Sequence, residues 1–422
     1  MTRSLRTRSV AAVTMGALGL ATVSACTVSS TDPSDGESVR VIAQAGGPGE
    51  ALQAAAESYN EQGLGATIEV SLFDYDAVRE RTVLGFNSGN ESYDVIGFDY
   101  AWMPEYVEND YLLSLNDHIG EAGDDANMDD FVSAYVDWAT IDEQQYAIPW
   151  FGAVYMLYYR ESLLQEAGVS VPTTWEEYAA AAKAVQDTTG VTGTTLIGKR
   201  DDPLMCEFWS IAWSYGADIV DGETVTLDTP EAAQALELWQ SILPNAPQDA
   251  LSADWPAAAA AFAEGKTAMM INFSDTSDAL LTSDVQDDIG FAALPAGPTG
   301  DSTPNLGGWG LGVSTGSQNQ DAAFDFIIWA TSAEQQTAGL DNGGSANRTS
   351  VLSDPELQER FPYFAAALEN YNNSVYFPVT SAWIDWEAAI SPPLSEAMSG
   401  TISVEDGLTQ AATRLTDEIA EG

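Results

Sequence analysis

Cysteine, histidine and metal-binding motifs are scarce in this 422-residue chain. The two cysteines are Cys26 and Cys206, and the single histidine is His118. No HExxH motif or paired cysteine set is present, and the acidic stretch "DDANMDD" lacks the glycine and the distal glutamate of a calcium loop. We therefore expect no disulfide framework, no metal site and no cofactor.

Positive charge is also scarce. Lysine and arginine total 14 against 64 aspartates and glutamates, which gives a formal net charge of −50. This surplus repels phosphate backbones and anionic lipids. We therefore expect no nucleic-acid partner, and a membrane contact only through a lipid anchor.

The chain has no convincing catalytic or phosphate-binding motif. "GVSTG" at 312–316 matches the GxSxG motif that carries the nucleophilic serine of many hydrolases. In those hydrolases the catalytic histidine follows the serine in the chain, whereas the only histidine here precedes it. The glycine-rich loop "AGGPGE" has neither the GxGxxG nor the GxxxxGK[ST] spacing of nucleotide-binding loops. The aspartates and glutamates are too numerous to single out the catalytic carboxylate pair of a glycosidase. We expect a protein that is not an enzyme, with an envelope carbohydrate hydrolase as the alternative.

The N-terminus has the pattern of an export signal. Three arginines precede an apolar run from Val10 to Ala25, which is short for a membrane span. Residues 23–26, "VSAC", resemble a bacterial lipobox, which implies a signal peptide over 1–25 and lipidation of Cys26. The polar residues 26–37 predict a flexible tether. An ordinary cleaved signal with an incidental cysteine is the alternative.

From Val39 onward, strands and helices alternate. The strands "VRVIAQA", "ATIEVSL" and "YDVIGFD" are separated by a helix over "EALQAAAESYNEQ" and a helix from about Tyr75. This order predicts a parallel sheet covered by helices, with ligands at the carboxyl ends of its strands. Polar groups and aromatic rings at those ends, among them Gln44, Asp74 and Asp99, suit a sugar better than a nucleotide.

Further elements follow from capping signals. A helix from about Arg160 to Ala167 ends at Gly168, and Thr174 with Glu177 forms a capping box for the next helix. "WPAAAAAFAEG" predicts a helix before a buried strand "TAMMINF". Two more helices are expected over "DAAFDFIIWATSAEQQTA" and "SVEDGLTQAATRLTDEI".

Several stretches resemble the family 1 extracellular solute-binding proteins of ATP-driven sugar importers. They are "DVIGFDYAWMPEYVENDYLLSLNDHI", "YAIPWFGAVYMLYYRESLLQEAGVSVPTTWEEY", "AFAEGKTAMMINF", "IGFAALPAGPTG" and "FIIWATSAEQQ", in the family's order. The resemblance implies an α/β, two-lobed, periplasmic-binding-protein-like (type II) fold, each lobe a mainly parallel sheet flanked by helices. It implies strands that cross between the lobes near Ala153, Ala268 and Ser314. Lobe 1 would comprise 38–153 and 269–314, and lobe 2 would comprise 154–268 and 315–422.

The same resemblance implies a function. The protein would capture a sugar or polyol in the cleft between the lobes and deliver it to the permease of an ABC importer. It would act as a monomer on the extracellular face of the cytoplasmic membrane, anchored through Cys26. A sugar-sensing receptor subunit is a further alternative to import.

A sugar site needs flat rings against the C–H faces and planar polar groups around the hydroxyl rim. For the rings we expect Trp102, Trp150, Tyr155 and Trp309, with Tyr75 beside them and Trp383 and Trp386 as weaker candidates. For the rim we expect Gln44, Asp74, Asp99, Arg200, Glu207, Asn272 and Arg348. Arg200 resembles the arginine that polyol-binding members offer to the ligand, and a surface ion pair with Asp201 or Asp202 is its alternative.

Overall fold

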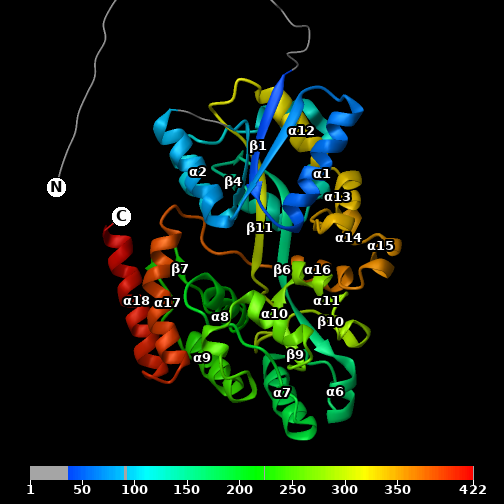
Figure 1. Ribbon diagram of the computed structural model, residues 1–422. Helices are drawn as coiled ribbons and strands as arrows, with labels where there is room; N and C mark the ends of the chain where they lie inside the picture. Colours follow the sequence, from blue (N-terminus) through cyan, green and yellow to red (C-terminus); the bar gives the residue numbers. More distant parts are fainter. Residues whose placement is uncertain (1–36, 90–92, 223, 422) are drawn as a thin grey trace, which may run out of the picture. The chain divides into compact units, whose positions relative to one another are not determined.

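The computed structural model describes residues 37–89, 93–222 and 224–421 (Figure 1). The predicted signal peptide, Cys26 and nearly all of the tether therefore lie outside the described residues. Within the described ranges, no helix combines the length and the apolar character that a membrane crossing requires.

One mixed sheet runs through the described part of the chain. Its strand order is β10-β6-β11-β3-β1-β2, and β9 also pairs with β6. The strands of the sheet are β1 (Ser38–Gln44), β2 (Thr67–Phe73), β3 (Val95–Asp99), β6 (Ile148–Arg160), β9 (Met269–Phe273), β10 (Ile289–Ala292) and β11 (Leu306–Val313). Two small hairpins add β4 (Thr140–Ile141) with β5 (Gln144–Gln145), and β7 (Val220–Asp221) with β8 (Thr224–Val225).

The sheet is parallel only where helices connect its strands. β1 pairs in parallel with β2 and β3, as the strand–helix alternation predicted. β11 is antiparallel to β3 and to β6, and β6 is antiparallel to β9 and β10. The α/β class is therefore confirmed, but the expectation of a mainly parallel sheet in each lobe is corrected to one mixed sheet.

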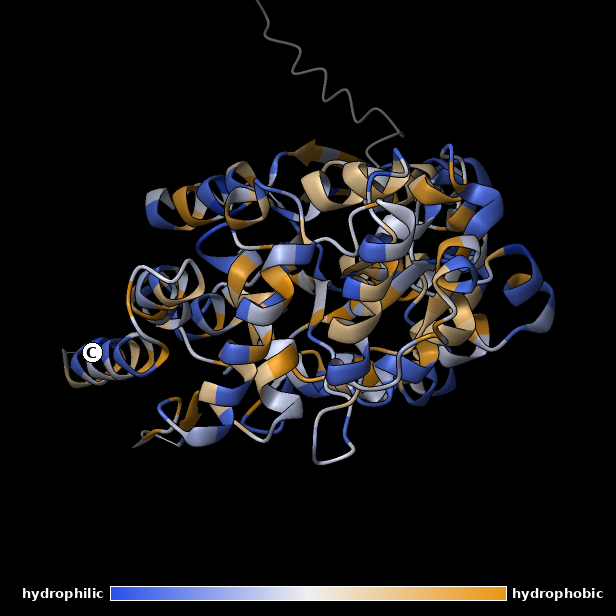
Figure 2. Ribbon diagram, turned by 90° about the horizontal axis from the view of Figure 1, so that it is seen from below, coloured by the Kyte–Doolittle hydropathy of each residue, from blue (hydrophilic) through white to orange (hydrophobic). Residues whose placement is uncertain are grey.

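Helices cover the sheet in two groups. The first group lies around β1, β2, β3 and β11 and extends to β6 and β10, against which its last helix, α16, packs. It comprises α1 (Gly47–Gln62), α2 (Tyr75–Ser88), α3 (Met103–Glu108), α4 (Asn116–Ala122), α5 (Ser133–Trp138), α12 (Gln320–Ala330), α13 (Ala333–Gly339), α14 (Thr349–Leu352), α15 (Pro355–Arg360) and α16 (Phe364–Tyr371). Around the distal part of β6 lie α6 (Glu161–Ala167), α7 (Trp175–Thr189), α8 (Asp202–Ser214), α9 (Pro230–Ile242), α10 (Trp255–Ala263), α11 (Ser277–Leu280), α17 (Trp383–Met398) and α18 (Val404–Glu421). In Figure 2, hydrophobic and hydrophilic stretches alternate along the helices, as expected where one face is buried.

The predicted signals around Gly168 and Thr174 are confirmed with one change. Gly168 ends α6 in the left-handed conformation with a φ of 69°. The Thr174 hydroxyl caps α7 by accepting from the Glu177 backbone N–H at 3.2 Å. The Glu177 carboxylate, however, accepts from the backbone and hydroxyl of Thr173, so the return half of the capping box is displaced by one residue.

Two hydrophobic cores form along the sheet. The first contains Val41, Phe98 and Ile327, and the second contains Trp209 and Leu394. Strand β6 contributes to both, because successive side chains of a strand point to opposite faces. Its side chains divide between the first core, which takes Val154, Met156 and Tyr158, and the second core, which takes Tyr155 and Leu157.

The boundaries between the two parts differ from those expected. The buried residues of helices α12 to α16 join the first core, because α12 packs against β3 and β11. Near the expected crossings at Ala268 and Ser314, Met269 pairs with Tyr159 towards the distal end of β6, and Ser314 bridges to Leu112. We propose instead that lobe 1 comprises 38–153 and 306–371, and lobe 2 comprises 154–305 and 372–422.

Candidate functional site

A cavity of about 180 Å³ lies where residues of both cores approach the carboxyl ends of β1 and β3. This is the edge at which open α/β sheets bind ligands. The lining residues are Gln44, Tyr75, Asp99, Tyr100, Phe151, Ala153, Gly307, Gly308 and Trp309 from lobe 1, and Asp202, Cys206, Trp255, Phe273 and Asp275 from lobe 2.

Aromatic rings form two walls of the cavity. On the lobe 1 side, Phe151 stacks on Trp309 with ring centroids 6.1 Å apart and an interplanar angle of 17°, and Tyr75 meets Trp309 edge to face. On the lobe 2 side, Trp255 packs against Phe273 at 5.8 Å. The cavity therefore presents flat apolar surfaces from both lobes.

The wall residue Trp255 is held from behind. Its indole N–H donates to the Tyr155 hydroxyl at 2.7 Å, and the Asn272 side chain donates to the Trp255 carbonyl at 3.1 Å. Tyr155 and Asn272 are both fully buried. Two residues that we expected to touch the ligand are thus supports for a third residue that lines the cavity.

Carboxyl groups supply the polar lining. Asp99 caps the short turn after β3 by accepting from the Ala101 N–H at 2.9 Å, and Asp202 accepts from the Cys206 thiol at 3.2 Å. Burial raises the pKa of Asp99 to about 8 and that of Asp275 to about 6, and it also raises the pKa of Asp202. These groups can accept hydrogen bonds from a polar ligand.

Four of the twelve expected site residues line the cavity, namely Gln44, Tyr75, Asp99 and Trp309. Trp102 lies behind this wall, packed edge to face on Tyr75 and Trp309 and 2% exposed. Trp150 lines only a different hollow of about 30 Å³, beside α1 and the 344–345 turn, whereas Phe151 borders both that hollow and the cavity. Phe151, the next residue on β6, takes the place that we expected for Trp150.

Three expected contacts lie away from the cavity. The Arg200 guanidinium reaches Ser395 at 3.3 Å and Glu396 at 4.0 Å on α17, so its surface pairing partner is neither Asp201 nor Asp202. Asp74 is exposed at the start of α2. The weaker candidate Trp383 stacks on Phe377 in the second core.

Glu207 is a buried structural carboxyl. It is 2% exposed and accepts from the Ile197 backbone N–H at 3.0 Å and from the Trp239 indole N–H at 3.2 Å. Burial raises its pKa to about 8 because no cation offsets the cost of enclosing the charge. Its role is to join α8, α9 and the segment at 197 inside lobe 2, which corrects the expected ligand contact.

We expect Glu207→Gln to flatten the pH dependence of stability. The folded pKa of about 8 exceeds the ordinary value of 4.5, so the folded protein binds more protons than the unfolded chain between these values. The free energy of unfolding therefore falls as pH rises through this window, by up to about 1.4 kcal/mol per pH unit for one group. Urea unfolding across the window measures the slope, and exposed Glu237→Gln is the control. Parallel profiles for wild type and Glu207→Gln would contradict the assignment.

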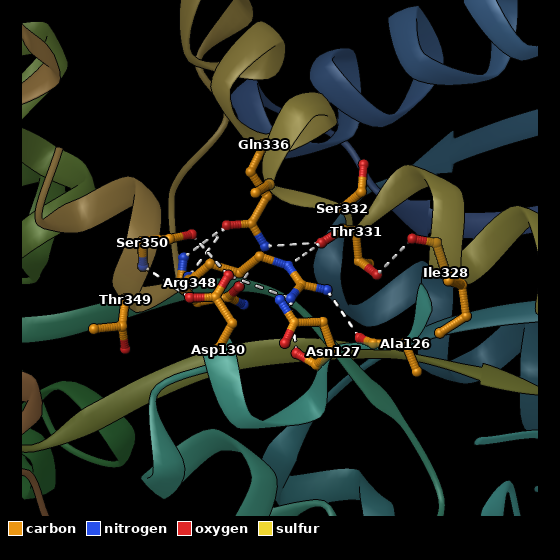
Figure 3. Close-up of polar contacts among 12 residues, drawn as sticks. Ala126, Asn127, Asp130, Ile328, Thr331, Ser332, Gln336, Arg348, Thr349 and Ser350 are labelled. Carbon is orange, nitrogen blue, oxygen red and sulfur yellow. Dashed lines mark hydrogen bonds and ion pairs between the residues drawn. The ribbon is translucent and has the colours of Figure 1, made fainter. Parts of the chain in front are cut away.

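Arg348 is also structural (Figure 3). It is 1% exposed, and its guanidinium donates to the carbonyls of Thr331 at 2.7 Å, Asn127 at 2.9 Å and Ala126 at 3.3 Å. It also pairs with Asp130 at 3.5 Å and stacks over the Phe131 ring. Each of its three guanidinium nitrogens donates to the protein itself, and Arg348 does not line the cavity, so the structure favours an internal clamp over the expected ligand contact.

Several lining residues were missed by the sequence reasoning. They are Tyr100, Phe151, Asp202, Cys206, Trp255, Phe273 and Asp275, with Ala153, Gly307 and Gly308. The two glycines adjoin Trp309, and a Cβ there would meet protein atoms, at 2.7 Å on Tyr135 for Gly308 and at 3.0 Å on Phe273 for Gly307. Those glycines therefore permit packing of the protein rather than approach of a ligand.

A larger hollow lacks the aromatic lining of this cavity, and the described residues offer no metal site. A hollow of about 590 Å³ lies on lobe 2 alone, among residues 190–192, 247–249 and 257–266, and no aromatic side chain lines it. Across residues 37–89, 93–222 and 224–421, no cluster of three or more His, Cys, Asp or Glu side chains is arranged to hold a metal ion.

The fold and the cavity define a class of protein: two α/β lobes that share a ligand cavity at their junction. The chain belongs to the bacterial extracellular solute-binding protein family, which matches residues 44–337. The resemblance seen in the sequence and the two-lobed fold that it implied are thereby confirmed.

Known proteins similar to this chain are transporter-associated binding proteins. A probable ABC transporter-binding protein of Deinococcus radiodurans is 28% identical over 307 residues, covering 68% of this chain and 70% of the relative. The diacetylchitobiose binding protein DasA of Streptomyces coelicolor is 27% identical over 314 residues, covering 72% and 70%. The solved structure of maltose-bound MalE3 from T. maritima has a TM-score of 0.79 and 26% identity, covering 90% of this chain and 98% of that chain.

Proposed function

We propose that this protein captures a sugar or polyol in the cavity between its lobes and delivers it to the permease of an ABC importer. The observation that carries the proposal is the cavity itself, where rings from both lobes flank carboxyl acceptors. Rings cover the C–H faces of a sugar, and carboxyls accept from its hydroxyls. The similarity to the diacetylchitobiose binding protein DasA and to maltose-bound MalE3 supports the same class of ligand.

Binding works by a shift between open and closed arrangements of the lobes. A ligand that contacts both walls favours the closed arrangement by the difference between its contacts in the two states. No covalent chemistry takes place in this proposal. The protein acts as a monomer on the extracellular face of the cytoplasmic membrane, anchored through a lipid on Cys26 after cleavage of residues 1–25.

The direct test is a thermal-shift screen of sugars and polyols. A ligand at a hundred times its dissociation constant should stabilise the folded protein by roughly 2.7 kcal/mol, which appears as a higher melting temperature. Small-angle scattering with and without the same ligand should show a more compact particle when it is bound. A panel without any stabilising sugar or polyol would contradict the proposal.

The alternative of an envelope hydrolase is tested on the same panel. Mass spectrometry after overnight incubation should recover every sugar intact if the protein only binds. Cleavage products that disappear when Asp99 is replaced by asparagine would instead establish a hydrolase.

A further inference from the structure

The charge of the cavity points to a narrower class of ligand. Asp99, Asp202 and Asp275 line it, and among the described residues its lining includes no lysine, arginine or histidine. Arg200 is the nearest cation along the chain to Asp202, but its guanidinium is directed to Ser395 and Glu396. The lining consequently offers several carboxyl groups and no cation. Burial favours the neutral form of these carboxyls, and a positive group on a ligand would favour their charged form.

A fourth carboxyl, Glu387 on helix α17, lies near these groups, although it is not among the lining residues. Burial raises the pKa of Glu387 most, and the nearby carboxyls of Asp202, Asp201 and Asp99 raise it further, to about 9. Its Oε1 atom is enclosed and has no hydrogen-bond partner among the described residues. Enclosed acceptors of this kind are costly unless a donor or a positive charge meets them.

The carboxyls come from both lobes. Asp99 follows β3 in lobe 1, whereas Asp202 lies at the start of α8 in lobe 2 and Glu387 lies on α17. Burial is the main reason that the pKa values of Asp99 and Glu387 are raised, and the nearby Asp202 carboxyl raises both of them further. Enclosing these groups together therefore has an energetic cost in their charged form. A positive group on the ligand would remove the cost at the junction where the two lobes meet.

The rest of the lining suits an organic cation better than a metal ion. Faces of Trp309, Trp255 and Phe151 border the same space, and aromatic faces attract ammonium groups. The described residues hold no metal-binding cluster of acidic, histidine or cysteine side chains. Rings and carboxyls together form the usual recognition site for an amine attached to a larger molecule.

We propose that the ligand is a carbohydrate or polyol that carries a protonated amine, bound with its ammonium group between Asp99 and Asp202. This inference rests on the proposed function and narrows its substrate class. A neutral sugar would pack on the rings and donate to some acceptors, but it would bring no positive charge to favour the ionised form of these carboxyls. An ammonium group makes charge-assisted hydrogen bonds that a hydroxyl cannot make.

Matched pairs of ligands test the charge preference. We would titrate the mature protein calorimetrically near neutral pH with three pairs of ligands, each a neutral molecule and its aminated counterpart. The pairs are sorbitol and 1-amino-1-deoxysorbitol, glucose and glucosamine, and cellobiose and chitosan disaccharide. Each aminated member should bind about tenfold or more tightly than its neutral counterpart, because charged hydrogen bonds are roughly twice as strong as neutral ones. EDTA should leave the result unchanged.

An exposed aspartate supplies the control for the cavity variants. Asp202→Asn should abolish most of the preference for the aminated member, and Asp99→Asn is a second variant in case the first folds poorly. Asp284→Asn removes the same formal charge from an exposed position of lobe 2, and Asp284 is not among the charges that shift the pKa of Asp99, Asp202 or Glu387. This control should keep the preference.

The outcomes separate this inference from the proposed function. If neutral members bind as tightly as aminated ones, the inference is wrong and the sugar-binding function stands. Equal losses of preference in Asp284→Asn and Asp202→Asn would assign the effect to the net charge of the whole protein, which also overturns the inference. Binding that requires added calcium would overturn it in favour of a metal. If no member of any pair binds, both the inference and the proposed function fail.

Discussion

Phe151→Ala is expected to weaken sugar binding by about ten- to a hundredfold. The Phe151 ring lines the cavity and is stacked on Trp309, so its removal takes away a flat surface against which a sugar ring would pack. Burial of a phenylalanine side chain contributes about 1.5 to 3 kcal/mol, which corresponds to this loss in affinity. Isothermal titration with the best ligand of the screen measures it.

Phe73→Ala is the matched control for this prediction. Phe73 is a partly buried phenylalanine of the same lobe, and the ring packs against Arg81 rather than lining the cavity. The Phe73 variant should keep its affinity for the ligand within about twofold. Equal affinities for wild type and Phe151→Ala would place the ligand elsewhere.

Arg348→Met is expected to lower the free energy of unfolding by about 3 to 5 kcal/mol, the cost of breaking a buried charged network by removing one partner. The carbonyls of Thr331, Asn127 and Ala126 would lose their donor inside the protein, and Asp130 would lose its cation. Urea unfolding measures the change.

A second arginine supplies the comparison for Arg348. Arg360 pairs with Asp341 near the surface, and surface ion pairs contribute about 1 kcal/mol or less. Arg360→Met should therefore leave stability nearly unchanged. Ligand affinity of the folded Arg348 variant should also be unchanged. An Arg348 variant that stays stable but binds the ligand weakly would instead support the ligand contact that the sequence suggested for Arg348.

Local structure followed closely from the sequence. The helices around Gly168 and Thr174 began and ended where capping residues indicated, because these signals act within a few residues. The first three strands also paired as expected, since a helix between successive strands favours a parallel arrangement. One predicted helix over 321–338 was split into α12 and α13, where the Ser332 side chain caps the second helix.

The site was only partly accessible to the same reasoning. Gln44 and Asp99 were found because they follow strands whose ends meet at one edge of a sheet. Trp150 and Phe151 were indistinguishable in sequence, since the face that each side chain takes depends on how β6 pairs with β11. Arg348 and Glu207 looked like ligand contacts because their charge is evident in the sequence but their burial is not.

The sequence alone determined the class of the fold, the caps of its helices and the family, because each depends on residue order and local chemistry. The tertiary structure alone decided that Arg348 clamps the interior, that Phe151 faces the cavity, and that carboxyls from both lobes share one space. The reason is physical. Burial, side-chain direction and the distance between charges arise only when segments far apart in the chain pack together.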